Sequence, residues 1–144
     1  MTVTTVPQTQ IQPPRTIGEW SLKQTVEVLS RPIPASMLKK KDTGIPYLPW
    51  RNAVKILDKY CPGWTWEIIT MQTTDNRLFL TGRLTITTAE GNIYREATGT
   101  ETLKLTKRTG EIVEHPYGDP SSNAESMAFR RACAKFGLGL YLYQ

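Results

Sequence analysis

The chain has little of what metal sites, disulfide scaffolds and membrane proteins need. It contains one histidine, His115, and two cysteines, Cys61 and Cys133, among 144 residues. These residues cannot supply a His-rich or Cys-x-x-Cys metal site, and two cysteines are too few for a disulfide scaffold. No apolar run approaches the about 20 residues of a membrane span, and no charged-then-apolar leader opens the chain. We expect a reduced cytoplasmic protein without metal or membrane contact.

Motifs for nucleotide hydrolysis and nucleophilic catalysis are also absent. No glycine-rich loop is followed by Lys-Ser or Lys-Thr, so the sequence indicates no ATP-binding loop and no cofactor. A Ser-His-Asp or Cys-His site would need His115, for which a solvated loop histidine is the simpler interpretation. Glu101 and Asp119 leave a small metal-dependent nuclease as an alternative, although their spacing defines no metal site. We expect a protein that is not an enzyme.

Positive charge is present, and it is unevenly distributed. The net charge is +5, from 18 Lys and Arg against 13 Asp and Glu. Residues 1–60 carry a net +5, residues 61–120 carry −2, and residues 121–144 carry +2. If the two basic segments meet in space, they form one cationic surface, which suits an anionic partner.

The first part of the chain reads as a tail followed by short helices. Residues 1–16 are rich in Thr, Gln and Pro and are predicted to be a flexible tail, with one domain over 17–144. A capping box at Ser21 predicts a short helix, and a second helix is expected over 50–60. Pro and Gly residues around Asp42-Thr43-Gly44 indicate a turn between them.

The second part changes to the alternation of β-strands. Residues 64–74, 77–88 and 93–106 predict a three-stranded antiparallel meander, which Ile112-Val113 could extend to four strands. A last helix is expected from Ser122 as its N-cap, with Glu125 completing a capping box. Its small residues recur every four positions, which allows close packing on a sheet: Ala124, Ala128 and Ala132. The predicted class is α+β with a β-β-β-α core.

Two groups of basic residues are candidates for binding an anion. The first comprises the run Lys39, Lys40 and Lys41 and the helical stripe Arg51, Lys55 and Lys59. The second comprises Arg130, Arg131 and Lys135. Each group could be only a solvated helix face. However, few acids stand beside them, and a phosphate backbone would relieve the repulsion among unpaired cations. Tyr47, just before the basic helix, is a candidate for stacking on a base.

The order of these features resembles the annealing domain of the Rad-fifty-two/Rad-twenty-two family of single-strand annealing proteins, including phage and bacterial types. A basic turn, Tyr47, a helix, Gly63-Trp64, a meander and a final helix follow in that order over residues 33–143. The most specific stretch is 119–139, which contains Ala-Phe-Arg-Arg-Ala-Cys-Ala-Lys-Phe-Gly at 128–137.

The resemblance implies ATP-independent annealing of complementary DNA strands in recombinational repair. It implies protomers arranged in a ring or filament, with single-stranded DNA in a positive groove. By position, Arg130 and Arg131 match the family's basic pair at the DNA backbone, and Lys135 follows Ala134, where a third basic residue is often found. Tyr47 matches the family's aromatic residue, and Lys39 to Lys41 match a basic turn near the groove. A single-strand binding protein is a further expected partner, and the expected location is the nucleoid of a bacterial or phage-infected cell.

A second interpretation is a module that binds single-stranded RNA or DNA without annealing it. Both interpretations use the same DNA-binding candidates: Arg130, Arg131, Lys135, Lys39, Lys40, Lys41, Tyr47, Arg51 and Lys55.

Overall fold

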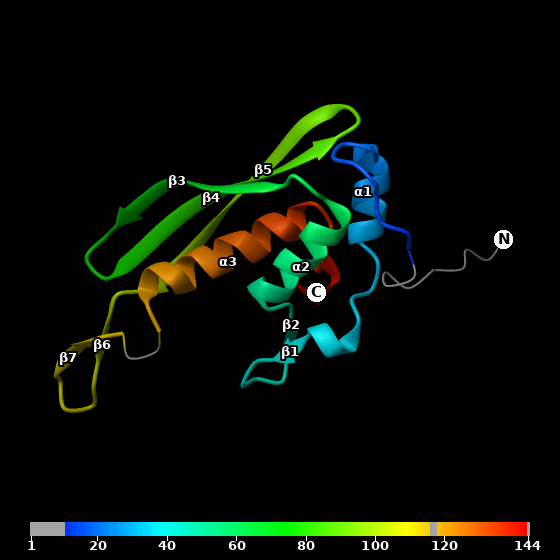
Figure 1. Ribbon diagram of the computed structural model, residues 1–144. Coiled ribbons are helices and arrows are strands. Elements are labelled where there is room, and N and C mark those ends of the chain that lie inside the picture. Colours follow the sequence, from blue (N-terminus) through cyan, green and yellow to red (C-terminus); the bar gives the residue numbers. More distant parts are fainter. Residues whose placement is uncertain (1–10, 116–117, 144) are drawn as a thin grey trace.

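A three-stranded antiparallel sheet with a long helix along one face forms the centre of the structure (Figure 1). The computed structural model describes residues 11–115 and 118–143. Strands β3 (Thr65–Thr73), β4 (Arg77–Thr88) and β5 (Gly91–Thr102) pair in the order β3-β4-β5. Helix α3 (Pro120–Lys135) packs on β4 and β5. The predicted α+β class and β-β-β-α core are therefore confirmed. Most of the predicted 1–16 tail lies outside the described residues.

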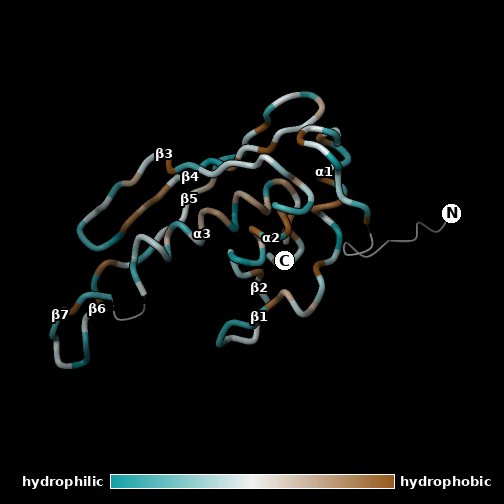
Figure 2. The backbone as a smooth tube through the Cα atoms, viewed as in Figure 1, coloured by the Kyte–Doolittle hydropathy of each residue, from teal (hydrophilic) through white to brown (hydrophobic). Residues whose placement is uncertain are grey.

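The alternation along β4 decides which face of the sheet is buried. Leu78, Leu80, Leu84 and Ile86 face α3 and are almost fully buried, while Phe79 on the other face is 36% exposed. Figure 2 shows the hydrophilic turn between β3 and β4 and hydrophobic stretches where β4 runs over α3. Burial of these side chains supplies the main free energy that holds the sheet to the helix.

Close contact between α3 and β5 depends on glycine and alanine. A Cβ atom at Gly99 would lie 1.8 Å from the carbonyl oxygen of Ala124 and 2.7 Å from the backbone nitrogen of Ala128. Both alanines are fully buried. The predicted row of small residues thus allows the two backbones to meet.

The N-terminus of α3 differs from the prediction. Asp119, not Ser122, is the N-cap: its carboxylate accepts hydrogen bonds from the backbone nitrogen of Ser121 at 3.2 Å and from the Ser121 hydroxyl at 2.9 Å. These bonds lower the pKa of Asp119. Pro120, whose fixed φ suits the first helical position, moves the helix start upstream. Glu125 is therefore free of capping and accepts a hydrogen bond from Trp66 Nε1 at 2.9 Å.

The N-terminal half packs beside α3 and completes the core. It contains α1 (Leu22–Leu29), the short helix η2 (Ala35–Met37), the strands β1 (Lys39–Lys40) and β2 (Pro46–Tyr47), and α2 (Trp50–Tyr60). Ser21 caps α1 as predicted, because its hydroxyl accepts from the backbone nitrogen of Gln24. Leu29, Leu57 and Phe136 are fully buried where these helices meet the end of α3.

The predicted fourth strand does not join the main sheet. Strand β7 (Ile112–Glu114) pairs with β6 (Lys104–Thr106) in a separate hairpin that projects from the body (Figure 1). Asn76 holds the base of this hairpin: its side chain donates to the carbonyl oxygen of Lys104 and accepts from its backbone nitrogen. In the described part of the chain, no helix is long and apolar enough to cross a bilayer.

Side chains of α3 cover the outer edge of β5. Lys135 Nζ donates to the carbonyl oxygen of Glu96 at 2.5 Å, and Arg131 Nη1 donates to that of Thr98 at 2.9 Å. The backbone nitrogen of Thr100 donates to Met127 Sδ at 3.4 Å. Met127, Arg131 and Lys135 recur every four residues, so they form one row along this edge. Within the described residues, no comparable bonds reach the outward backbone of β3.

Replacing Gly99 by alanine should destabilise the protein strongly. The added Cβ meets backbone atoms of α3, which cannot move without separating helix and sheet, so we expect a loss of about 3 kcal/mol in unfolding free energy. Urea denaturation followed by circular dichroism measures this loss. The neighbouring variant Thr98→Ala removes one hydroxyl pair on the outer face and should cost less than about 1 kcal/mol. Equal losses would contradict the close contact.

Replacing Lys135 by alanine tests the covered β5 edge. Loss of the bond to the Glu96 carbonyl should lower the unfolding free energy by about 1 kcal/mol, since the ammonium group is solvent-exposed. Lys23→Ala on the exposed face of α1 is the control and should change it by less than about 0.5 kcal/mol. If both variants unfold at the same urea concentration, Lys135 does not stabilise the edge.

Candidate nucleic-acid interface

A cleft of about 290 Å³ brings the two basic segments of the sequence together. It lies between the β1–β2 hairpin, α3 and the C-terminal helix η3 (Leu140–Tyr143). Lys41 and Tyr47 line it from the hairpin, and Arg130 and Arg131 line it from α3. Its remaining lining is mostly apolar: Ile45, Pro46, Leu48, Ala53, Met127, Cys133, Leu138, Gly139, Leu142 and Tyr143.

Tyr47 holds two cations beside each other in this cleft. Lys41 Nζ lies 5.9 Å from the centre of the tyrosine ring, and Arg130 Cζ lies 5.6 Å from it. Each such contact contributes about 0.5–1 kcal/mol at a partly exposed site, which offsets some of the repulsion between the cations. Neither cation has a carboxylate partner among the described residues. The positive charge of the cleft is therefore not neutralised.

The hairpin places Lys41 and Tyr47 by a tight turn. Lys39 pairs with Tyr47 across the two strands, and the Lys41 backbone nitrogen donates to the carbonyl oxygen of Ile45 at 3.0 Å. Gly44 has φ of 82°, a left-handed conformation that favours glycine, and donates to the Lys41 carbonyl. The sequence predicted this turn and an extended segment over 45–49, which contains β2. Strands of two residues give no periodic signal, so β1 and its pairing with β2 were not predicted.

The end of α3 supplies the other wall. Gly137, with φ of 101°, reverses the chain, and the Leu138 backbone nitrogen donates to the carbonyl oxygen of Cys133. The chain then continues into η3, so that Tyr143, 57% exposed, lines the cleft. Sequence reasoning missed Tyr143; its only signal is the apolar, aromatic run after Gly137.

The predicted binding residues fall into three places. Lys41, Tyr47, Arg130 and Arg131 line the cleft, although Arg131 also binds the Thr98 carbonyl. Lys135 lies on the β5 edge and does not line the cleft. The rest are outside its lining, exposed on β1 or α2: Lys39, Lys40, Arg51 and Lys55.

The two cysteines are unsuited to act as nucleophiles. Both are buried, Cys133 beneath the cleft and Cys61 at the end of α2. Burial raises the pKa of Cys61 to about 12 and also raises the pKa of Cys133. Both side chains are therefore neutral thiols at physiological pH, whereas the thiolate is the reactive form.

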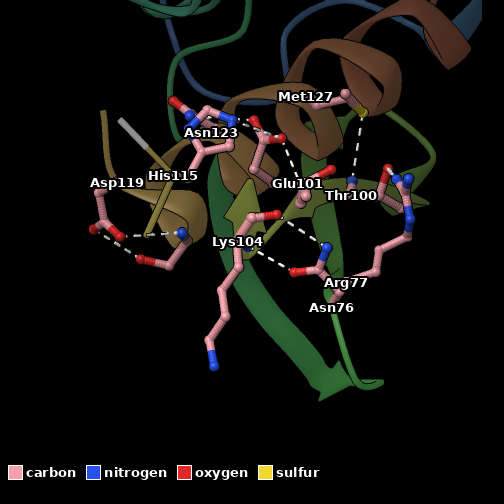
Figure 3. A network of polar contacts seen from close by, with 11 residues as sticks. Asn76, Arg77, Thr100, Glu101, Lys104, His115, Asp119, Asn123 and Met127 are labelled. Carbon is pink, nitrogen blue, oxygen red and sulfur yellow. Dashed lines mark hydrogen bonds and ion pairs between the residues drawn. The ribbon is translucent and has the colours of Figure 1, made fainter. Parts of the chain in front are cut away.

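The acids of the nuclease alternative have separate structural partners (Figure 3). Glu101 Oε1 lies 3.4 Å from His115 Nε2, and Glu101 Oε2 accepts from Asn123 at 3.2 Å. Asp119 caps α3. The His115 side chain is only 12% exposed, so the expectation of a solvated histidine is wrong. Across residues 11–115 and 118–143, no group of three or more His, Cys, Asp or Glu is placed to hold a metal ion.

The sequence is similar to those of two plant proteins whose names describe DNA repair. No protein-family model matches the chain. The chain is 33% identical over 127 residues to "DNA repair RAD52-like protein 1, mitochondrial" of Arabidopsis thaliana, a match that covers 85% of this chain and 67% of that protein. It is 38% identical over 122 residues to "DNA repair RAD52-like protein 2, chloroplastic" of the same plant. That match covers 80% of this chain but 57% of the relative.

Both identities exceed 30% and extend over most of this chain, and the chain therefore belongs to the RAD52 family.

Proposed function

We propose that the protein binds single-stranded DNA and anneals complementary strands without ATP, in DNA repair and recombination. One observation carries this: the cleft collects Lys41, Arg130 and Arg131 from two remote segments around the ring of Tyr47. The names of both relatives, which describe DNA repair proteins, support the same role.

The chemistry of the cleft suits a phosphate backbone. Among the described residues that line it there is no acid and no amide side chain. Cations without carboxylate partners bind the phosphates of a nucleic acid, which are the same at every position of the sequence. Tyr47 offers a ring on which one base can stack. The site therefore favours sequence-independent binding.

Annealing requires binding and alignment rather than bond cleavage. Among the described residues that line the cleft there is no carboxylate, and Cys133 is a buried thiol. A protein that neutralises the phosphates of one strand lowers its repulsion for a second strand, and pairing of the bases then supplies the free energy. On this basis we propose a binding protein that is not an enzyme.

We also propose that the protein assembles with copies of itself in a ring or filament. The β3 edge is uncovered within the described residues, and Ile68 and Met71 on this strand are 46% and 51% exposed. Apolar side chains beside an open edge are typical of an interface. Light scattering should give a mass several times 16.3 kDa, and Met71→Glu should lower it. A wild-type monomer would contradict assembly.

The cleft is tested by replacing Lys41 and Arg130 together with glutamine. Loss of two phosphate contacts should weaken binding of an oligonucleotide and reduce the slope of log K against log salt by about 1.4. Fluorescence anisotropy at several salt concentrations measures both. The control is Arg15→Gln with Lys23→Gln, which removes the same charge from exposed positions outside the cleft. An unchanged slope in the cleft variant would overturn the assignment.

Annealing itself is measured with two complementary labelled oligonucleotides in the absence of any nucleoside triphosphate. The wild-type protein should accelerate pairing, and the Lys41/Arg130 variant should do so less. Binding without acceleration would instead favour a module that only binds single-stranded DNA or RNA.

A further inference from the structure

A second cavity, of about 240 Å³, lies on a different face of α3 from the cleft. Three of the four tryptophans of the chain line it: Trp50 on α2, and Trp64 and Trp66 at the start of β3. Glu125 and Phe129 of α3 form another wall. The cavity is smaller than the about 300–1,000 Å³ of sites for drug-sized ligands, so its size suits a single planar ring system.

The walls of this cavity are held rigidly. Trp64 Nε1 donates to Asp58 at 2.7 Å, and Trp66 Nε1 donates to Glu125 Oε2 at 2.9 Å. The ring of Phe129 packs against both indoles, with centroids 5.8 Å and 5.1 Å away. Trp50 at the mouth is 45% exposed. The cavity thus presents fixed aromatic surfaces beside the exposed ring of Trp50.

A row of cations follows the face of α2 next to this cavity. Trp50 and Val54 line the cavity from α2, and Asp58, one turn on, binds the Trp64 indole. Arg51, Lys55 and Lys59 lie one position further round the same helix, outside the lining. All three cations are exposed, and none has an ion-pair partner in the described part of the chain. Successive members are about 6 Å apart along the helix axis. Arg51 Cζ also lies 5.5 Å from the centre of the Trp50 ring.

We propose that this cavity is a second single-stranded nucleic-acid site, in which one base enters between the tryptophans and the adjoining phosphates lie on Arg51, Lys55 and Lys59. The inference rests on the proposed function. Stacking platforms beside a cationic track are the usual means of holding a single strand. Glu125 Oε1 has no hydrogen-bond partner among the described residues and can accept from a base. Each of the four bases carries an N–H donor, so this contact does not select one sequence.

A second copy of the chain is the competing occupant of such an apolar cavity. We assign self-assembly to the β3 edge, and a second copy, with its net charge of +5, would bring charge of the same sign to the three cations beside this cavity. A nucleic-acid strand brings the opposite charge to the same cations. Electrostatics therefore favours the strand.

Tryptophan fluorescence tests this site directly. The fourth tryptophan, Trp20, is buried in the core, so stacking of a base should quench mainly the three cavity tryptophans. The wild-type protein is titrated with an oligonucleotide of thymidines and, separately, with an abasic oligonucleotide of the same length. We expect quenching by the first and little by the second, because only the first carries bases.

Trp50→Ala should lower the affinity measured by fluorescence quenching at least about fivefold. Trp50→Phe retains an aromatic ring and should keep most of this affinity. Tyr94→Ala, which removes an exposed ring from the outer face of the sheet, is the control and should behave as wild type. Arg51→Gln with Lys55→Gln should lower the same affinity and the annealing rate. The Lys41/Arg130 variant should keep the quenching and lose affinity measured by anisotropy.

The outcomes separate the two sites. Binding seen by anisotropy without quenching, or Trp50→Ala indistinguishable from wild type, overturns the second site and leaves the cleft intact. A fall in mass by light scattering for Trp50→Ala, with no change in quenching, shows that a second copy fills the cavity and also overturns it. No binding by either method overturns the proposed function and the second site together.

Discussion

The contact between α3 and β5 is the constraint on which the rest of the structure depends. Gly99 leaves room for the backbone at Ala124 and Ala128, and nothing larger fits between them. Once the helix lies this close to the sheet, its rotation about its own axis is fixed. One row of side chains then reaches the β5 edge, a second faces the hairpin of Tyr47, and a third faces the tryptophan cavity. A single close approach thus assigns a role to each remaining face of α3.

On the faces that we assign to nucleic acid, the cations contact carbonyl groups and aromatic rings rather than carboxylates. Arg131 binds a backbone carbonyl, and Lys41, Arg130 and Arg51 lie beside aromatic rings. Carbonyls and rings orient a cation but do not cancel its charge. The outer face of the sheet shows the contrast. Arg83 there binds Glu96 at 2.7 Å and lies 3.7 Å from Glu67, and the hydrogen bond to Glu96 raises the pKa of Arg83. That arginine is neutralised, and it faces away from the cleft.

Sequence reasoning succeeded where a long periodic signal exists and failed where contacts are non-local. The alternation of β4, the span of α2 and the small residues of α3 were all predicted, because each depends on neighbours along the chain. The cap of α3 was misplaced by three residues, since Pro120 outweighed a capping box at Ser122. The partners of Arg131 and Lys135 could not be predicted, because the carbonyls of Thr98 and Glu96 are 33 and 39 residues away and carry no side-chain signature. The pairing of Lys41 and Arg130 through Tyr47 was suggested only by charge distribution and by family resemblance.

The separation of the cationic groups bears on the proposed annealing of two strands. Lys41, Tyr47 and Arg130 lie in the cleft, whereas Arg51, Lys55 and Lys59 follow α2 beside the tryptophans. If these five cations all faced one groove, they would hold one strand more tightly and leave a second strand without a site. Two separate proposed sites, joined by the buried contact of α2 with α3, would instead hold two strands, or two parts of one strand, at a fixed distance. Annealing depends on releasing a mispaired strand as well as on holding one, because only a strand that dissociates can sample another register. Division of the positive charge between two moderate sites is therefore consistent with annealing, while its concentration in one groove would favour storage of a single strand.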